Sequence, residues 1–360
     1  MSESEKQELL LEFRVPAGYG EAARLDVYLT AQIQNATRAK VQRGIKEGRV
    51  SIQGKVIKKR SYTIQAGDHI ECLILKSPPI ELLPEDIPLD ILYEDEYLLV
   101  VNKSAGMVVH PGYGNRTGTL VHALLHHVGA GKIEMEDVDE DERTDDDVGL
   151  SVINTSSEPT GDRVIRPGIV HRLDKDTTGA LVVAKNDEVH AHLAKQFARR
   201  TIRREYQAIV WGSPNPADGR IESYLGRDSQ DRRRMTSTDE DHGKLAITNY
   251  KTLESLGHTT LMEFKLETGR THQIRAHAKM IGHPVFGDAM YGGKTILKGS
   301  QAGPRQVFFR GLFERLPRQA LHAYKLGFMH PIHGTEVMSV APFPEDMIFV
   351  IEELKFRDSY

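Results

Sequence analysis

The chain has 360 residues, more than one compact domain usually holds, and 39% of them are hydrophobic, which is enough for a sizeable core. Its formal net charge of -4 argues against a uniformly basic nucleic-acid binder. The single cysteine, Cys72, excludes disulfides and multi-cysteine zinc sites and fits a reducing cytosol. The polar start MSESEKQELL lacks a signal-peptide core, and no apolar run approaches the ~20 residues of a membrane span. We therefore expect a cytoplasmic protein without membrane association.

The N-terminal region predicts a small basic domain. Residues 1–21 are expected to form a loose lead-in. Helical spacing of apolar residues begins after Arg24, a second helix is expected between Thr37 and Gly48, and short strands follow near residues 50–57. Nine Lys or Arg against one acid occur between positions 38 and 60, a pattern typical of phosphate contacts but also of a solvated helix face. The outward-facing cations of the second helix are Arg38, Lys40, Arg43 and Lys46.

Composition then divides the rest of the chain. Residues 22–75 resemble the small alpha-L RNA-binding domain of a small-subunit ribosomal protein, so we assign residues 22–77 to an RNA-binding domain. Residues 78–89 are rich in proline and acids and are interpreted as a linker. A second domain is expected over residues 90–352. Within it, residues 130–165 include an almost wholly acidic run, which predicts a mobile insertion.

Two blocks of the second domain carry the chemistry-bearing side chains. The stretch from Arg166 to Lys185 packs charged residues and a histidine between a Pro-Gly turn and an apolar run that predicts a buried strand. Such a loop is typical of a functional site, although a turn capped by Asp and Thr has the same composition. In the second block, Glu267–His277, Thr271 is predicted to cap a helix with a cationic face, an arrangement that favours phosphate.

Two weaker patterns point elsewhere. A predicted short helix carries His122, His126 and His127, but no local carboxylate or cysteine completes a metal site, and surface histidines are the more common explanation. Gly-Lys-Thr at 293–295 has the end of a P-loop, yet that motif requires glycine where Asp288 stands. We expect neither a metal nor a nucleotide-binding loop.

The string HRLDKDTTG, preceded by RPGIV and followed by LVVAK, resembles the signature of the RluA-type pseudouridine synthases. The similarity covers most of the chain from Arg24 to about Met347, apart from the acidic insertion. It implies an α+β fold: a catalytic domain with a largely antiparallel, mixed and bent β-sheet flanked by helices and loops, and a small α+β RNA-binding domain before it.

The resemblance also implies roles for individual residues. The aspartate of HRLD, Asp174, would be catalytic, Tyr206 would be the active-site tyrosine, and Arg275 would pair with the aspartate. Arg172 is expected to fill the space left by a flipped base. Arg232 lies on a basic loop similar to one that binds RNA in the family. The expected substrate-binding residues are His171, Arg172, Leu173, Thr177, Gly269, Arg270 and His272.

The function implied is isomerisation of specific uridines to pseudouridine in structured RNA, with the target base flipped out of its stack. The aspartate could attack the sugar carbon or remove a sugar proton, and the sequence leaves both routes open. No redox step or energy input is needed, so no cofactor is expected. The expected partner of this monomer is large-subunit ribosomal RNA or a pre-ribosomal particle, with transfer RNA as the runner-up. A non-catalytic RNA-binding or ribosome-assembly protein and an unrelated carboxylate hydrolase are the alternatives.

Overall fold

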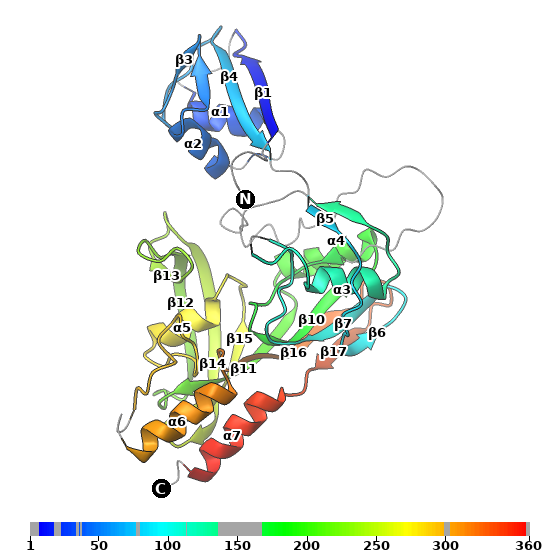
Figure 1. The fold of residues 1–360 in the computed structure, drawn as a ribbon, viewed down its shortest axis with the longest axis vertical. Coiled ribbons are helices and arrows are strands. Elements are labelled where there is room, and N and C mark those ends of the chain that lie inside the picture. Colours follow the sequence, from blue (N-terminus) through cyan, green and yellow to red (C-terminus); the bar gives the residue numbers. More distant parts are fainter. Residues whose placement is uncertain are drawn as a thin grey trace. The chain divides into compact units, whose positions relative to one another are not determined.

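The chain divides into two compact units, residues 1–81 with 134–144, and residues 82–133 with 145–360. Both units combine helices with sheets (Figure 1). No helix in the described part of the chain is long and apolar enough to cross a membrane. The computed structural model describes residues 7–17, 23–33, 36, 38–76, 80–112, 114–135, 168–298 and 303–357. The acidic insertion predicted at 130–165 therefore lies outside the described residues, apart from 130–135.

The described residues of the first unit form a four-stranded sheet with two helices, of which the sequence predicted the helices and the short strands near residues 50–57. The helices are α1 (Leu25–Gln32) and α2 (Arg38–Lys46), and their inner residues Leu25, Leu29 and Ile45 are fully buried. They pack in one apolar core with residues of the sheet. The strand order is β1 (Gln7–Arg14), β4 (His69–Lys76), β2 (Val50–Ile52) and β3 (Lys55–Val56).

The prediction of a loose lead-in at residues 1–21 is wrong for residues 7–14. These residues form β1, which pairs antiparallel with β4 from Gln7–Lys76 to Arg14–His69. Leu11 and Phe13 are half-buried and Val15 is buried, while the residues between them are exposed. This alternation is that of a strand with one covered face, which the charged residues at the start of the chain obscured.

The second unit is built on one large sheet of eleven strands (Figure 1). Its main path runs β13-β12-β14-β15-β11-β16-β10-β7-β6, with β17 beside β16 and β9 beside β10. Among the described residues, its strands pair antiparallel except for β10 with β16. The α+β class and the predominantly antiparallel mixed sheet are therefore confirmed. The strands are β6 (Ile91–Glu94), β7 (Leu98–Lys103), β9 (Gly168–Ile169), β10 (Thr178–Ala184), β11 (Arg203–Trp211), β12 (Asp218–Arg227), β13 (Met235–Thr238), β14 (Lys244–Leu256), β15 (Thr259–Leu266), β16 (Leu321–Met329) and β17 (Glu336–Val340).

Five helices in the described ranges accompany this sheet. Helix α4 packs against β10 and β9, α5 against β13 and β14, and α7 against α6 and β14. They are α3 (Leu120–His127), α4 (Asp187–Ala198), α5 (Gln273–Met280), α6 (Pro304–Arg315) and α7 (Glu345–Arg357). A separate two-stranded sheet joins β5 (Ile80–Leu82) to β8 (Ile133–Met135).

Strand β10 is the buried strand predicted after the signature loop, and all seven of its residues are buried. Its first residues form the parallel pair with β16, where Gly179 lies opposite Ala323. A Cβ atom on Gly179 would lie 2.3 Å from the Ala323 carbonyl oxygen, and its φ of +113° also disfavours any other residue. The glycine that ends the charged motif thus lets two strands meet directly behind the loop.

Two segments before α3 are held to it by hydrogen bonds. The described residues 107–109 form no strand, because their carbonyls are used elsewhere. The Val108 and Val109 carbonyls accept the N–H groups of Leu120 and Val121 at the start of α3. The linker predicted at 78–89 is also partly fixed, since the Glu85 N–H donates to the His122 carbonyl of α3 at 3.1 Å.

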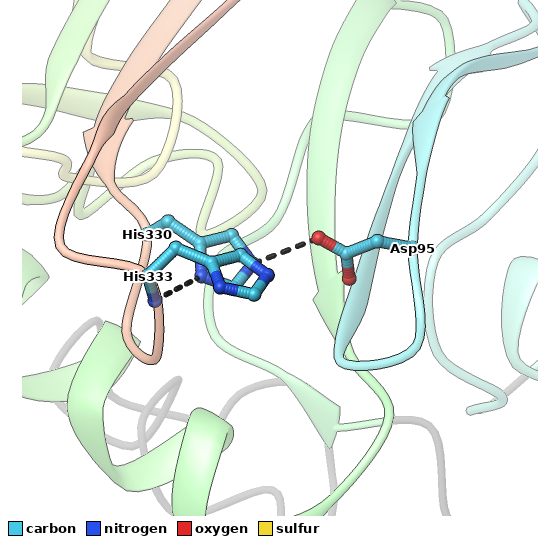
Figure 2. A group of neighbouring side chains, drawn as sticks. All are labelled: Asp95, His330 and His333. Atoms are coloured by element: carbon cyan, nitrogen blue, oxygen red, sulfur yellow. Dashed lines mark hydrogen bonds and ion pairs between the residues drawn. The ribbon is translucent and has the colours of Figure 1, made fainter.

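A hydrogen-bonded junction joins the β6–β7 turn to the β16–β17 turn (Figure 2). The Asp95 carboxylate accepts the N–H groups of Tyr97 and Leu98, the Tyr93 hydroxyl, and Nε2 of the buried His330 at 2.8 Å. His330 Nδ1 accepts the Ile332 and His333 N–H groups, which makes Nε2 the protonated nitrogen. The junction holds two turns that are more than 230 positions apart.

We predict that Asp95→Ala lowers the free energy of unfolding of the second unit by about 2–3 kcal/mol, because several donors at the junction lose their acceptor. The only tryptophan, Trp211, is fully buried in this unit, so its fluorescence in a urea titration reports the loss. Asp90→Ala removes a single exposed bond to Asn102 and should change the value by less than about 0.5 kcal/mol. Equal effects of the two substitutions would contradict the assignment.

Candidate active site

A cleft of about 360 Å³ opens in the second unit in front of β10 and β11. Its lining comes from the loop before β10, the end of α4, the first residues of β11, and residues 266–275 at the start of α5. The structure brings together ten of the eleven residues predicted in this domain. They are His171, Arg172, Leu173, Asp174, Thr177, Tyr206, Gly269, Arg270, His272 and Arg275.

The central contact of the cleft joins two segments separated by a hundred residues. Arg275 Nη1 donates to Asp174 Oδ2 at 2.9 Å. The other edge of the same guanidinium is held by buried Asp288, through Nε to Oδ2 at 2.6 Å and Nη2 to Oδ1 at 3.0 Å. Asp288 Oδ1 also accepts the N–H groups of Met290 and Tyr291. Arg275 is therefore fixed on one side and presents its remaining edge to Asp174.

The surrounding charges keep the Asp174 carboxyl ionised. Burial by itself would raise its pKa, but His272, Arg275 and Arg172 outweigh burial and hold the pKa below its ordinary value. His272 Nε2 lies 3.8 Å from Asp174 Oδ2. Burial lowers the pKa of His272, although the neighbouring Asp174 carboxylate opposes this shift. The carboxylate retains 20% exposure and remains open to the cleft.

Tyr206 enters the cleft at an irregularity of β11. The pairing of β11 with β16 changes register between Glu205 and Gln207, which leaves Tyr206 at the bulge. A bulge turns a side chain away from the regular alternation of a strand and is common beside active sites. Burial raises the pKa of the Tyr206 phenol, although Arg204 opposes the rise, so the hydroxyl stays protonated at neutral pH.

Several predicted residues shape the cleft through contacts within the protein. His171 Nε2 accepts the Val182 N–H at 3.1 Å, and its ring stacks on Phe197. Burial lowers the pKa of His171 to about 3, so it acts as a neutral acceptor that holds the loop to β10. The Thr177 hydroxyl accepts a bond from Gln319 Nε2 at 3.2 Å.

The segment before α5 differs from its prediction in one respect. Thr271 does not cap the helix: α5 begins at Gln273, and its N-cap is His272, which has a left-handed φ of 54° and no capping side-chain bond. Gln273 Oε1 instead accepts the Arg270 N–H at 2.9 Å. The left-handed residue turns the chain sharply, and this is how His272 comes beside Asp174.

The predicted RNA-binding residues lie outside this cleft. Arg232 is exposed on the loop between β12 and β13 and is not part of the lining. In the first unit, Arg38 donates to the fully buried carboxylate of Asp26 at 3.0 Å. That carboxylate also accepts Arg24 and Gln42. Arg38 therefore contributes to the packing of its own unit, whereas Lys46 is exposed on the same helix.

Two buried cations that the sequence did not single out hold the loop carrying Asp174. Lys103 Nζ donates to the carbonyls of Ser104, Met107 and Lys175 at 2.8–2.9 Å. Burial lowers the pKa of Lys103 to about 7, while Asp174 and Asp176 act in the opposite direction. The signal in the sequence is a lysine at the end of the apolar run that forms β7.

The second cation, Arg318, holds the next carbonyl of the loop. Its Nη1 donates to the Asp176 carbonyl at 3.0 Å, and Asp346 of α7 holds the other edge at 2.7 and 2.8 Å. The role of Arg318 could not be predicted from the sequence, because nothing in it indicates that positions 176, 318 and 346 meet.

One set of side chains in the described ranges has the composition of a metal site, namely Asp95, His330 and His333. Both carboxylate oxygens and both nitrogens of His330 are already used in the junction described above. His122 is buried against Thr119, and His127 pairs with Glu94, so the predicted histidine helix does not assemble a ligand set. We assign no metal to either group.

We predict that Asp288→Asn lowers the pKa of Asp174 further below its ordinary value, because the substitution removes a neighbouring negative charge and lets the freed guanidinium pair with both oxygens of Asp174. The measurement is a ¹³C NMR titration of the aspartate carboxyl groups. Asp228→Asn breaks an ion pair with Arg234 at 2.9 Å outside the cleft lining and serves as the matched control. An unchanged Asp174 pKa in Asp288→Asn would show that Arg275 needs no second anchor.

Comparison with known proteins identifies the family of this chain. The family model described as RNA pseudouridylate synthase matches residues 97–280, and the model of the S4 domain matches residues 23–70. An uncharacterized RNA pseudouridine synthase of Chlorobaculum parvum is 45% identical over 92% of this chain and 94% of that protein. The RNA pseudouridine synthase 2, chloroplastic, of Arabidopsis thaliana is 42% identical over 96% of this chain and 83% of that protein. The ribosomal large subunit pseudouridine synthase D of Zymomonas mobilis is 41% identical over 92% of this chain and 93% of that protein.

The predicted resemblances are thereby confirmed for both parts of the chain. The protein belongs to the RNA pseudouridylate synthase family, with an S4 domain at its N-terminus, and is an RNA uridine isomerase.

Proposed function

We propose that this enzyme isomerises uridines of large-subunit ribosomal RNA, with Asp174 as its catalytic group. The observation that carries the proposal is an ionised, partly exposed carboxylate held at 2.9 Å by Arg275 in a cleft that Tyr206 also lines. The S4 domain and the names of relatives such as the synthase D of Zymomonas mobilis support ribosomal RNA as the substrate.

The reaction rearranges one nucleotide without gain or loss of atoms overall. The bond between uracil N1 and the sugar carbon C1′ breaks, the base turns, and C5 bonds to C1′. C5 then loses a proton and N1 gains one. A carboxylate can assist bond cleavage either as a nucleophile on C1′ or as a base towards a sugar proton. Both routes require an ionised Asp174 with one oxygen free of Arg275.

The remaining residues fit roles around that step. Tyr206 would stack against the uracil and, because its hydroxyl stays protonated, would assist proton movement at C5 only after losing its own proton. Arg172 would occupy the space that the flipped nucleotide leaves, and flipping costs a few kcal/mol. The buried walls formed by Leu173 and Ile274 would exclude water from the free base.

We predict that Asp174→Asn abolishes tritium release from RNA transcribed with [5-³H]uridine, while RNA binding is retained, because the amide can neither ionise nor act as a nucleophile. Unmodified large-subunit ribosomal RNA and bulk transfer RNA are assayed side by side. Tritium release from transfer RNA and not from ribosomal RNA would show that transfer RNA is the substrate. Release by Asp174→Asn at the parent rate would refute the catalytic role, and no release by the parent from either RNA would favour a binding protein that retains the fold.

The S4 domain is proposed to anchor the RNA through its phosphates. We predict that the triple substitution of Lys40, Arg43 and Lys46 by Gln flattens the slope of log affinity against log salt by about two, the loss of three phosphate contacts. Arg38 is kept because it pairs with buried Asp26. Fluorescence anisotropy with labelled RNA gives the slope, and Asp174→Asn, which leaves these cations in place, should match the parent. A triple variant with the parent slope would remove this helix from the interface.

A further inference from the structure

The cleft carries more positive charge than its carboxylate requires. Five arginines line it, at positions 172, 200, 204, 270 and 275, against two acids, Asp174 and Glu267. Arg275 is neutralised by Asp174 and Asp288. Glu267 accepts Asn249 at 2.9 Å and pairs with Arg220, which lies outside the lining. Neither acid of the lining forms an ion pair with Arg204 in the described part of the chain.

Arg204 is the most informative of them. It lies two positions before Tyr206 on β11 and lines the same cleft. Its Nε is buried without a hydrogen-bond partner, and no carboxylate in the described part of the chain forms an ion pair with it. Burial lowers its pKa, and nearby Arg200 and Arg270 act in the same direction, while Tyr206 opposes them. A half-buried guanidinium among like charges is stabilised when an anion joins it.

The protein positions this side chain, because two neighbours define where it lies. Its Cζ lies 5.6 Å from the centre of the Phe197 ring, which covers one face of the guanidinium and leaves its edges for hydrogen bonds. On another side, a Cβ atom on Gly269 would lie 2.5 Å from Arg204 Nη1. Glycine at this position therefore provides the space that the guanidinium occupies.

We propose that Arg204, stacked on Phe197 and accommodated by Gly269, is a subsite for a backbone phosphate of the RNA next to the target uridine. A guanidinium edge matches two phosphate oxygens, and a phosphate supplies the charge that this side of the cleft lacks. Arg200 and Arg270 contribute to the same positive field. The assignment rests on the proposed entry of a nucleotide into this cleft, and it adds the group that fixes the backbone beside that nucleotide.

The test compares Arg204→Gln with Arg203→Gln in the full-length protein. Arg203 is the adjacent, exposed residue of β11, and its Nη1 lies 3.8 Å from Glu336 Oε1. Tritium release from transcribed large-subunit ribosomal RNA is measured between about 50 and 200 mM KCl. Arg204→Gln should raise KM about tenfold or more at the lower salt concentration, leave kcat within a few-fold, and reduce the slope of log kcat/KM against log salt by about one. Arg203→Gln should match the parent.

Two further variants separate charge from geometry. Arg204→Lys keeps the charge and should retain the salt slope while losing part of the affinity, because an ammonium lacks the planar fork. Gly269→Ala keeps the arginine but displaces its guanidinium, and should raise KM in the same direction. Parent values of KM and slope in Arg204→Gln, with a parent-like thermal midpoint, would overturn the subsite, and so would a loss confined to kcat.

The same question is answered without catalysis by measuring RNA binding in the Asp174→Asn background. There, Arg204→Gln should again lose about one unit of salt slope relative to Asp174→Asn alone. A parent enzyme that releases no tritium from ribosomal RNA, together with an Arg204-dependent slope, would refute the proposed substrate and support the phosphate subsite. An unchanged salt slope in the Arg204→Gln variant, together with normal tritium release by the parent enzyme, would refute the phosphate subsite and support the proposed substrate.

Discussion

The structure of the site depends on one guanidinium held by two carboxylates. Asp288 is fully enclosed and binds Arg275 through two nitrogens, so only Nη1 is left to reach Asp174. A mobile arginine could bind the carboxylate through both oxygens and leave neither of them open to the cleft. Because Asp288 fixes the arginine from behind, the carboxylate is held ionised through one oxygen and remains available through the other.

The loop that carries Asp174 is held in a different way, through its main chain. Lys103 and Arg318 donate to the carbonyls of Lys175 and Asp176, which follow Asp174 directly. Gly179 then brings β10 against β16 at the end of the same loop. Contacts to the backbone do not depend on the loop's side chains, so those side chains remain free to face the cleft. Arg318 is in turn held by Asp346, which makes the C-terminal helix part of the support of the site.

The sequence predicted the residues that face the cleft better than those that support it. Asp174, Tyr206 and Arg275 stand in contiguous motifs, and the buried strand after the signature followed from its apolar run. Asp288 was noticed only because it excludes a P-loop, and its pairing with Arg275 depends on a turn that brings the two together across 13 positions. Strand β1 was not predicted because it has one exposed face and lies beside charged residues, and because its pairing partner β4 is far away in the sequence.

The distribution of charge separates the parts of the molecule that serve folding from those that serve binding. Charged side chains that stabilise the fold form ion pairs, such as Asp26 with Arg24 and Arg38, and Arg318 with Asp346. Arg204, on one side of the cleft, differs from them, because burial and the neighbouring arginines both lower its pKa. A fold under no constraint but stability would replace such a group with an apolar one or supply an acid. The protein retains it beside Tyr206, and the unfavourable field disappears only when an anion enters. The net charge of -4 therefore says little about this surface, because the binding of a polyanion is decided by the local field that it meets.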